Sequence, residues 1–283
     1  TISKLVPLAL FIAIGIFFIN GANFTPVFPQ DIYVDGSFAQ AAVLLFFAYT
    51  GFEVIAIAAE DMKNPKKNLP RAIIMCMLLV SVLYMAILAV SIGVLGTDLA
   101  NTKAPVQDAF NVIVGPIGMY IVLVGTLISM GGINFAEAYY APRVATSMAE
   151  DGMLPSALAK RNRYNAPYVA AIITAIASVL LAWSGSFTTL AAISAVSRFT
   201  QYLPTCLAVI IFRRKWADKA RSYTIPGGYL IPVIAIGTSL WMLAQAQTNQ
   251  LLWGLGGCII ILPFYYSYWK KKKAGLIKDH DEM

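Results

Sequence analysis

Eight long apolar stretches divide this chain of 283 residues, and they limit the folds open to it more than any other feature. Most of them approach the ~20 residues that a helix needs to cross the hydrocarbon layer of a membrane. They are not the alternating ~10-residue segments of an outer-membrane β-barrel. Only 12% of the residues are charged, whereas soluble domains carry about 25%. We therefore predict an all-α integral membrane protein.

The chain contains no long linker rich in glycine, serine or charge, so we expect a single transmembrane domain over residues 1–283. The expected membrane-spanning helices are Leu5–Asn20, Phe38–Glu60, Ala72–Leu95, Pro116–Met148, Pro167–Trp183, Phe187–Phe212, Leu230–Gln245 and Leu252–Trp269. A shorter segment, Ala104–Val114, places Val106, Ala109, Phe110 and Ile113 at helical spacing. This spacing predicts an amphipathic helix, which serves either as a lid or as a plain connector.

Cationic side chains gather in alternate connections between the apolar stretches. They cluster in 63–71, 160–163, 213–221 and 270–273. The connection over residues 20–37 has no cation, and the one over 96–115 has a single lysine. Because basic loops stay in the cytoplasm, we expect a multi-pass protein with both chain ends cytoplasmic. These clusters fit contact with anionic lipids, and we expect no binding of nucleic acid.

The second apolar stretch is interrupted in its middle by residues 49–53, Tyr-Thr-Gly-Phe-Glu. Glycine weakens a helix, and a carboxylate is costly at bilayer depth. Unwound backbone survives there only against protein or a water-filled cavity. The carbonyl and amide groups that such a break frees can hold a zwitterion, as in many secondary transporters. The alternative is an intact helix that turns one polar face into the bundle.

Four ionisable residues lie within or at the edge of the apolar stretches. Placing a charged side chain at membrane depth costs free energy, so each of these residues is a candidate for a functional role. Glu53 either links two half-helices, carries a proton, or caps the amides of the second half-helix. Glu137 either lines a pocket or pairs with a neighbour. Arg198 needs an anionic partner, in a gate or in a pair that only holds helices together. Judged from the physics of the sequence alone, Lys4 is an ordinary anchor at the cytoplasmic end of a helix.

Nothing in the chain points to an enzyme. There is no GxxxxGK[ST] phosphate loop, no HExxH and no CxxC pair. The single histidine, His280, lies in the charged C-terminal tail, so no Ser-His-Asp triad can form. We expect no cofactor and no metal site.

Four motifs carry a resemblance to a known family. Residues 46–53 and 58–70 resemble the sixth helix and the following loop of the amino acid–polyamine–organocation (APC) transporters, and in particular the bacterial amino acid permeases. Residues 141–143 and 148–155 resemble the end of the eighth helix. The resemblance implies helices five to twelve of a twelve-helix, LeuT-like fold with a five-plus-five inverted repeat. The first four helices would be missing, and a complete substrate site would require them.

The resemblance also implies roles for residues at the break. The carbonyls of Phe47, Ala48 and Thr50 would face the α-amino group of a bound amino acid. Gly51 would permit the break, and Phe52 would close over the substrate.

Two residues elsewhere gain roles from the same resemblance. Glu137 falls near an eighth-helix position that contacts the substrate side chain. Lys4 matches a lysine that takes the place of a sodium ion in sodium-independent members, and this favours a coupling role in which its proton switches.

The expected function is a secondary active transporter of amino acids in the plasma membrane. It would work by alternating access around the broken helix, either as a proton symporter or as an amino acid exchanger. Lys4, Glu53 and Arg198 would take part in coupling or gating. The alternatives are an amino acid sensor or binding subunit without net transport, and an inactive truncated fragment.

Overall fold

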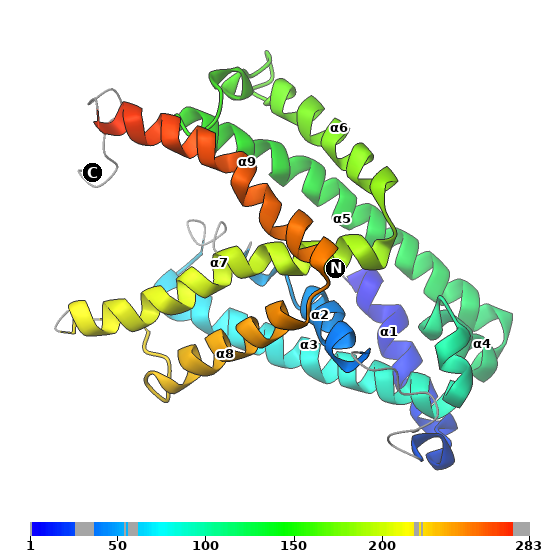
Figure 1. Ribbon diagram of the computed structural model, residues 1–283. Helices are drawn as coiled ribbons and strands as arrows, with labels where there is room; N and C mark the ends of the chain where they lie inside the picture. Colours follow the sequence, from blue (N-terminus) through cyan, green and yellow to red (C-terminus); the bar gives the residue numbers. More distant parts are fainter. Residues whose placement is uncertain are drawn as a thin grey trace. The chain divides into compact units, whose positions relative to one another are not determined.

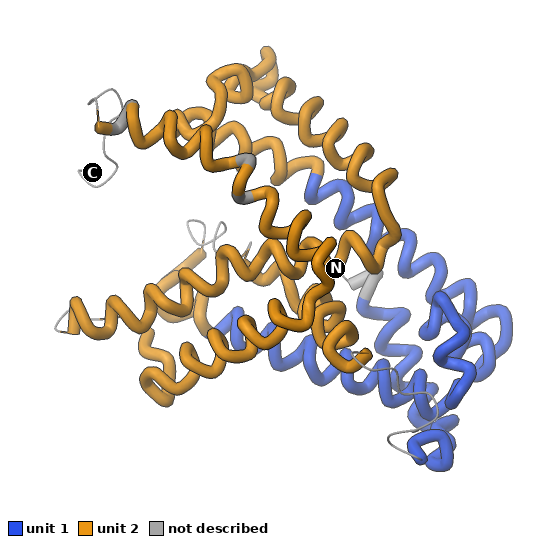
Figure 2. The backbone as a smooth tube through the Cα atoms, viewed as in Figure 1, with its two compact units in different colours: residues 1–34, 71–137 blue, residues 35–70, 138–283 orange. Residues whose placement is uncertain are grey.

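The computed structural model describes residues 2–25, 37–53, 55, 62–217, 221 and 223–273. Every regular element in these residues is helical, as the apolar pattern predicts (Figure 1). The chain forms two compact units, residues 1–34 with 71–137 and residues 35–70 with 138–283 (Figure 2). The division falls within the two longest described helices, α3 (Pro65–Leu95) and α5 (Pro116–Glu150), so each contributes to both units.

The first unit packs around a core formed by α1, α3, α4 and α5. Besides α3 and α5, its elements are α1 (Ile2–Gly15), η1 (Ile16–Phe18), η2 (Gly21–Phe24), η4 (Gly96–Asn101) and α4 (Pro105–Val114). Phe11 of α1 meets Phe110 of α4 edge to face, with ring centroids 5.6 Å apart. Val90 of α3 and Val122 of α5 complete this buried cluster.

The amphipathic helix predicted over Ala104–Val114 is present as α4. Ala109, Phe110 and Ile113 are buried, and Val106 packs against the same cluster. The apolar face chosen from the spacing is therefore the one that the fold buries.

The second unit is arranged around α7, which packs against α2, α8 and α9. Its elements, besides the ends of α3 and α5, are α2 (Ser37–Ala48), η5 (Ser156–Ala159), α6 (Tyr168–Ser184), α7 (Phe187–Lys215), α8 (Leu230–Gln245) and α9 (Thr248–Lys273). A Cβ at Gly254 of α9 would lie 2.7 Å from Cγ1 of Val196 on α7, so the glycine permits this close approach. The hydroxyl of Ser197 on α7 donates a hydrogen bond to the carbonyl of Gly254 on α9 at 3.0 Å, which stabilises the contact between the two helices.

Within the described residues, four helical stretches are long and apolar enough to cross a membrane: Pro65–Asn101, Pro116–Glu150, Phe187–Lys215 and Thr248–Lys270. They contain four of the predicted spans. Shorter apolar helices fall in the other four: Leu5–Phe18, Ser37–Ala48, Tyr168–Ser184 and Leu230–Gln245. The membrane character of the chain is therefore supported, and the count of eight spanning helices stays a prediction.

Candidate functional site

The α-helix of the second apolar stretch ends at the place where the sequence predicts an interruption. Helix α2 ends at Ala48, and the next two amides bond to carbonyls three residues back instead of four. The N–H of Tyr49 donates to the carbonyl of Phe46 at 3.1 Å, and that of Thr50 donates to Phe47 at 3.0 Å. The main chain therefore leaves α-helical geometry at the position where the sequence places glycine and glutamate.

Gly51 gives the break a backbone conformation that other residues rarely adopt. Its φ is +103°, in the region that side-chain-bearing residues rarely adopt. A Cβ added there would meet no atom within 4 Å, so backbone conformation and not crowding requires the glycine. Residue 54 and residues 56–61 lie outside the described part of the chain, so the second half-helix stays a prediction.

The carboxylate of Glu53 joins the break to helix α7. Its Oε2 accepts hydrogen bonds from the N–H of Gly51 at 2.9 Å and from the hydroxyl of Tyr202 at 3.1 Å. Its Oε1 pairs with the guanidinium of Arg198. The side chains of Glu53 and Arg198 are only 18% and 30% exposed, so both charges lie largely inside the unit and neutralise each other. We call Glu53, Arg198 and Tyr202 the α7 latch.

This arrangement answers one question that the sequence leaves open. The anionic partner that Arg198 requires is Glu53. The carboxylate caps an amide of the break itself, that of Gly51, which precedes it by two residues. Sequence reasoning missed Tyr202, although it follows Arg198 by four residues and therefore lies on the same face of a helix.

Aromatic rings surround the latch. Phe52 stacks on Tyr202, with centroids 5.9 Å apart. Phe46 packs against Tyr202 edge to face at 5.8 Å and stacks on Phe199 at 4.7 Å. The neighbouring Phe47 meets Phe187 at the start of α7 edge to face, with ring centroids 6.1 Å apart. The ring predicted to close over a substrate is thus held against α7, beside the carboxylate.

The carbonyl of Phe47, one of the predicted substrate ligands, is already engaged. It accepts the N–H of Thr50 at 3.0 Å and the hydroxyl of the same residue at 2.7 Å. A carbonyl oxygen has two lone pairs, so both are in use. Contact of Phe47, Ala48 and Thr50 with an amino acid stays a prediction.

Two other predicted residues, Glu137 and Lys4, belong to the first unit, whereas the break belongs to the second. Glu137 lies on α5 and is exposed, as are the residues on either side of it except Ala136. Whether it lines a pocket or pairs with a neighbour stays a prediction. Lys4 lies in the first turns of α1, and its side chain is outside the described part.

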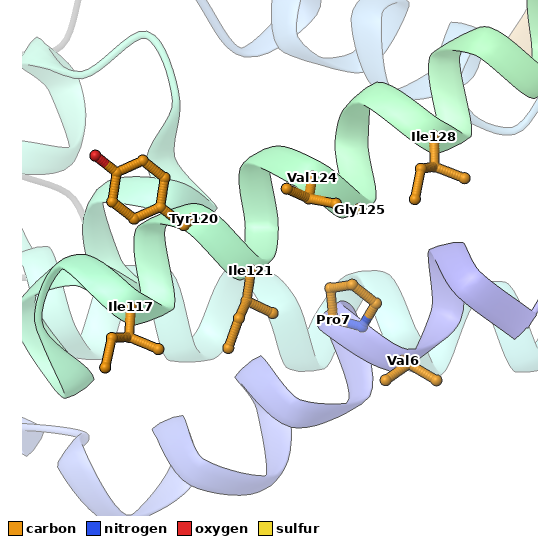
Figure 3. A pocket seen from close by; sticks show the side chains of 8 residues that line it. All are labelled: Val6, Pro7, Ile117, Tyr120, Ile121, Val124, Gly125 and Ile128. Atoms are coloured by element: carbon orange, nitrogen blue, oxygen red, sulfur yellow. The ribbon is translucent and has the colours of Figure 1, made fainter.

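An apolar groove of about 570 Å³ lies between α1 and α5 in the first unit. Figure 3 shows Pro7 and Val6 of α1 opposite Ile121 and Val124 of α5. A zwitterion in such a lining would lose its hydration for few hydrogen bonds, so the groove does not suit an amino acid backbone. Among the described residues, no group of three or more His, Cys, Asp or Glu side chains is placed to hold a metal ion.

The chain is similar to proteins of one family over most of its length. A family model described as "Amino acid permease" matches residues 1–264. The branched-chain amino acid permease BcaP of Bacillus subtilis is 29% identical over 277 residues, which cover 95% of this chain and 58% of that protein.

Two further relatives come from the same organism. The methylthioribose transporter is 30% identical over 241 residues, covering 85% of this chain and 52% of that protein. The serine/threonine exchanger SteT is 28% identical over 286 residues, covering 97% of this chain and 64% of that protein. This chain thus spans between half and two thirds of the length of these relatives, and all three are permeases or transporters and not enzymes.

Proposed function

This chain belongs to the amino acid permease family, and we propose that it forms part of a secondary active transporter that carries amino acids across the plasma membrane. The observation that carries the proposal is the break at the end of α2, where the amide of Gly51 donates to the Glu53 carboxylate and this carboxylate contacts Arg198 and Tyr202 of α7. Backbone that leaves helical geometry within an apolar stretch is how such transporters build a central site.

The substrate site would be the main chain of the break. The carbonyls of Phe47, Ala48 and Thr50 would accept from the α-amino group, and Phe52 would cover the ligand from its position on Tyr202. Because the Phe47 carbonyl is fully engaged by Thr50, an ammonium group must displace the threonine hydroxyl to bind there. Glu137 remains our proposal for a contact with the substrate side chain.

The charge balance of the latch favours a neutral amino acid as substrate. Glu53 and Arg198 cancel each other, so the described residues at the break present no net charge to a ligand. A zwitterion also carries no net charge, and backbone carbonyls and amides satisfy its two ends. A cationic substrate would need a further carboxylate, a role for which Glu137 is the available residue.

Alternating access would require the break to move relative to part of its surroundings. The α7 latch is suited to control this motion, because one carboxylate holds the amide of Gly51 and two side chains of α7 at once. Opening the latch exposes two partly buried charges, so it would be favourable only when another ligand or proton compensates them. Proton symport and amino acid exchange both fit, and Lys4 would couple a proton in place of sodium.

The orientation follows from the basic clusters, which would lie in the cytoplasm together with both chain ends and contact anionic lipids. The four helices that the resemblance places before residue 1 would supply the rest of the substrate site. The complete protein is therefore the proper subject for any test of activity.

The test is radiolabelled flux into sealed proteoliposomes that hold the full-length protein. We expect uptake of neutral amino acids that accumulates against a gradient, driven either by a proton gradient or by an internal amino acid. Saturable binding without counterflow would instead establish a sensor or binding subunit. Neither binding nor flux would indicate an inactive product.

A further inference from the structure

A small polar cavity lies in the second unit, where the first turns of α2, α7 and α9 meet the last turn of α8. Its volume is about 150 Å³, far above the ~10–15 Å³ that one water molecule requires. Its polar lining consists of carboxamides and hydroxyls: Gln40, Thr188, Thr189, Gln245, Gln247 and Gln250. We call this the outer carboxamide cavity.

Some of the lining groups are fixed by local bonds, and others have unused hydrogen-bonding capacity. The Oε1 of Gln250 accepts from the N–H of Gln247 at 3.0 Å, and the Thr189 hydroxyl lies 2.9 Å from that of Ser186. The carboxamides of Gln40 and Gln245 have no hydrogen-bond partner among the described residues. Each carboxamide offers two donors and an acceptor oxygen, so these two side chains are available to a ligand.

The chemistry of the lining selects a small zwitterion. Carboxamide oxygens and hydroxyls accept from an ammonium group, and carboxamide N–H groups donate to a carboxylate. No charged side chain lines the cavity, so a solute with net charge would lose hydration without a counter-charge. A free neutral amino acid and the ethanolamine headgroup of a lipid share this zwitterionic chemistry.

The cavity lies at the end of α7 that is opposite to its basic end. Helix α7 begins at Phe187 beside the cavity and finishes with Arg213, Arg214 and Lys215. Phe38 and Trp241 form a ring contact of 6.2 Å near the same helix ends, as expected for side chains at a membrane–water interface. If the basic end is cytoplasmic, the cavity opens to the outside.

The cavity wall also continues into the packing of the break. Val43 lines the cavity and belongs to the buried cluster against which Phe46 and Phe47 pack. Helix α2 therefore lines the cavity with its first two turns and leads to the break at its C-terminal end.

We propose that the outer carboxamide cavity is a second, external binding site for the zwitterionic neutral amino acid, through which the solute passes before it reaches the break in α2. Gln40 and Gln245 are its principal ligands. The proposal rests on the transport function proposed above, but it concerns residues that have no part in the central site.

The experiment is side-resolved transport by the full-length protein in proteoliposomes of phosphatidylglycerol, with the double variant Gln40→Leu/Gln245→Leu. We expect the KM for an amino acid added outside to rise fivefold or more, while the KM measured from the inside and the maximal rate stay unchanged. Gln107→Leu, on α4 of the other unit, is the matched control and should change neither KM.

Three outcomes would overturn the external site. The first is an unchanged external KM in the double variant, and the second is an equal rise of the external and internal KM. The third is an effect of the double variant that appears only when ethanolamine lipid is present, which would assign the cavity to a lipid headgroup. Absence of flux in the wild-type protein would instead refute the transport function itself. In that case the external site is tested by equilibrium binding of the labelled amino acid. It is supported only if the wild-type protein binds two amino acid molecules and the double variant binds one.

Discussion

Glu53 makes three interactions through one carboxylate. Its two oxygens receive a backbone amide, a phenol and a guanidinium. The Arg161–Glu150 pair provides a contrast, because its side chains are 41% and 47% exposed and water can replace either partner. A pair as sheltered as Glu53 and Arg198 leaves an uncompensated charge when one member is removed.

Arg198→Gln should therefore lower both the melting temperature and the transport rate. Leaving Glu53 without its counter-charge costs on the order of 2 kcal/mol, less than a fully buried pair because both side chains retain some exposure. The double variant Glu53→Gln/Arg198→Gln should recover most of the melting temperature, because the two carboxamides can hydrogen-bond to each other. It should not recover transport, because the charged pair of the α7 latch is absent.

The control for this pair is Arg161→Gln, which removes an exposed ion pair worth at most about 1 kcal/mol. Thermal unfolding in detergent and uptake in proteoliposomes measure both effects. Equal melting temperatures for Arg198→Gln and Arg161→Gln would show that the latch does not hold the break.

Thr50→Val tests whether the Phe47 carbonyl binds the substrate. The substitution keeps the shape of the side chain and removes the hydroxyl that occupies the second lone pair of that carbonyl. A competing hydrogen bond of this kind is worth about 0.5–1.5 kcal/mol, so the KM for the amino acid should fall roughly twofold to twelvefold.

Thr205→Val is the matched control, because its hydroxyl also donates to a carbonyl of its own helix, that of Gln201, at 2.7 Å. Its KM should equal that of the wild-type protein. A Thr50→Val variant with unchanged or higher KM would remove Phe47 from the set of substrate ligands.

Single residues also show how far the sequence can predict the site. The cost of a buried charge indicates that Arg198 needs an anion, and glycine beside glutamate indicates the break. The pairing of Glu53 with α7 could not be predicted, because Tyr202 lies 149 residues away and several carboxylates compete as partners. The same cost argument makes Glu137 a candidate for a pocket or an ion pair; its side chain is exposed among the described residues, and its role stays a prediction.

At the scale of elements, apolar length predicts the helices well and their ends less well. Helix α3 begins at Pro65, seven residues before the predicted Ala72, and includes Pro70 in its second turn. Pro65 suits a first helical position because its missing N–H would have no partner there. The charged residues and prolines of 65–71 predict a loop, whereas the helix extends beyond its apolar part on the N-terminal side.

The break in α2 depends on the backbone of Gly51, and this gives a prediction for the element. Gly51→Ala would place a Cβ at a φ of +103°, at a cost of roughly 1–2 kcal/mol. We expect a lower melting temperature, or a break that rearranges toward regular helix with loss of transport.

Gly237→Ala supplies the comparison, since Gly237 is in the interior of α8 with open space around its Cα. Alanine there should be neutral or stabilising by up to about 1 kcal/mol. If the two alanine variants unfold at the same temperature and transport equally, the conformation of Gly51 is not required for function.

At the scale of the whole molecule, the distribution of charge predicts the orientation. The last turn of α7 carries Arg213, Arg214 and Lys215, and the opposite helix ends carry glutamine, threonine and aromatic residues. The same asymmetry recurs in the connections of the entire chain, so one face of the membrane should meet nearly all of its cations.

Cysteine labelling tests this orientation. In a background where the three native cysteines are replaced, Ser186→Cys should react with a membrane-impermeant maleimide added to intact cells, because it precedes α7 on the outer side. Lys160→Cys, which is also exposed, should react only after the cells are opened. Labelling of Lys160→Cys in intact cells would invert the proposed topology.

The central claim is that main chain released at the break in α2 binds an amino acid. The most direct measurement is an experimental structure of the full-length protein with a transported neutral amino acid bound. We predict the ammonium group within hydrogen-bond distance of the Phe47 and Thr50 carbonyls, with the Thr50 hydroxyl turned away and Phe52 over the ligand. A continuous ladder of helical hydrogen bonds through Gly51, with the amino acid bound elsewhere, would contradict it.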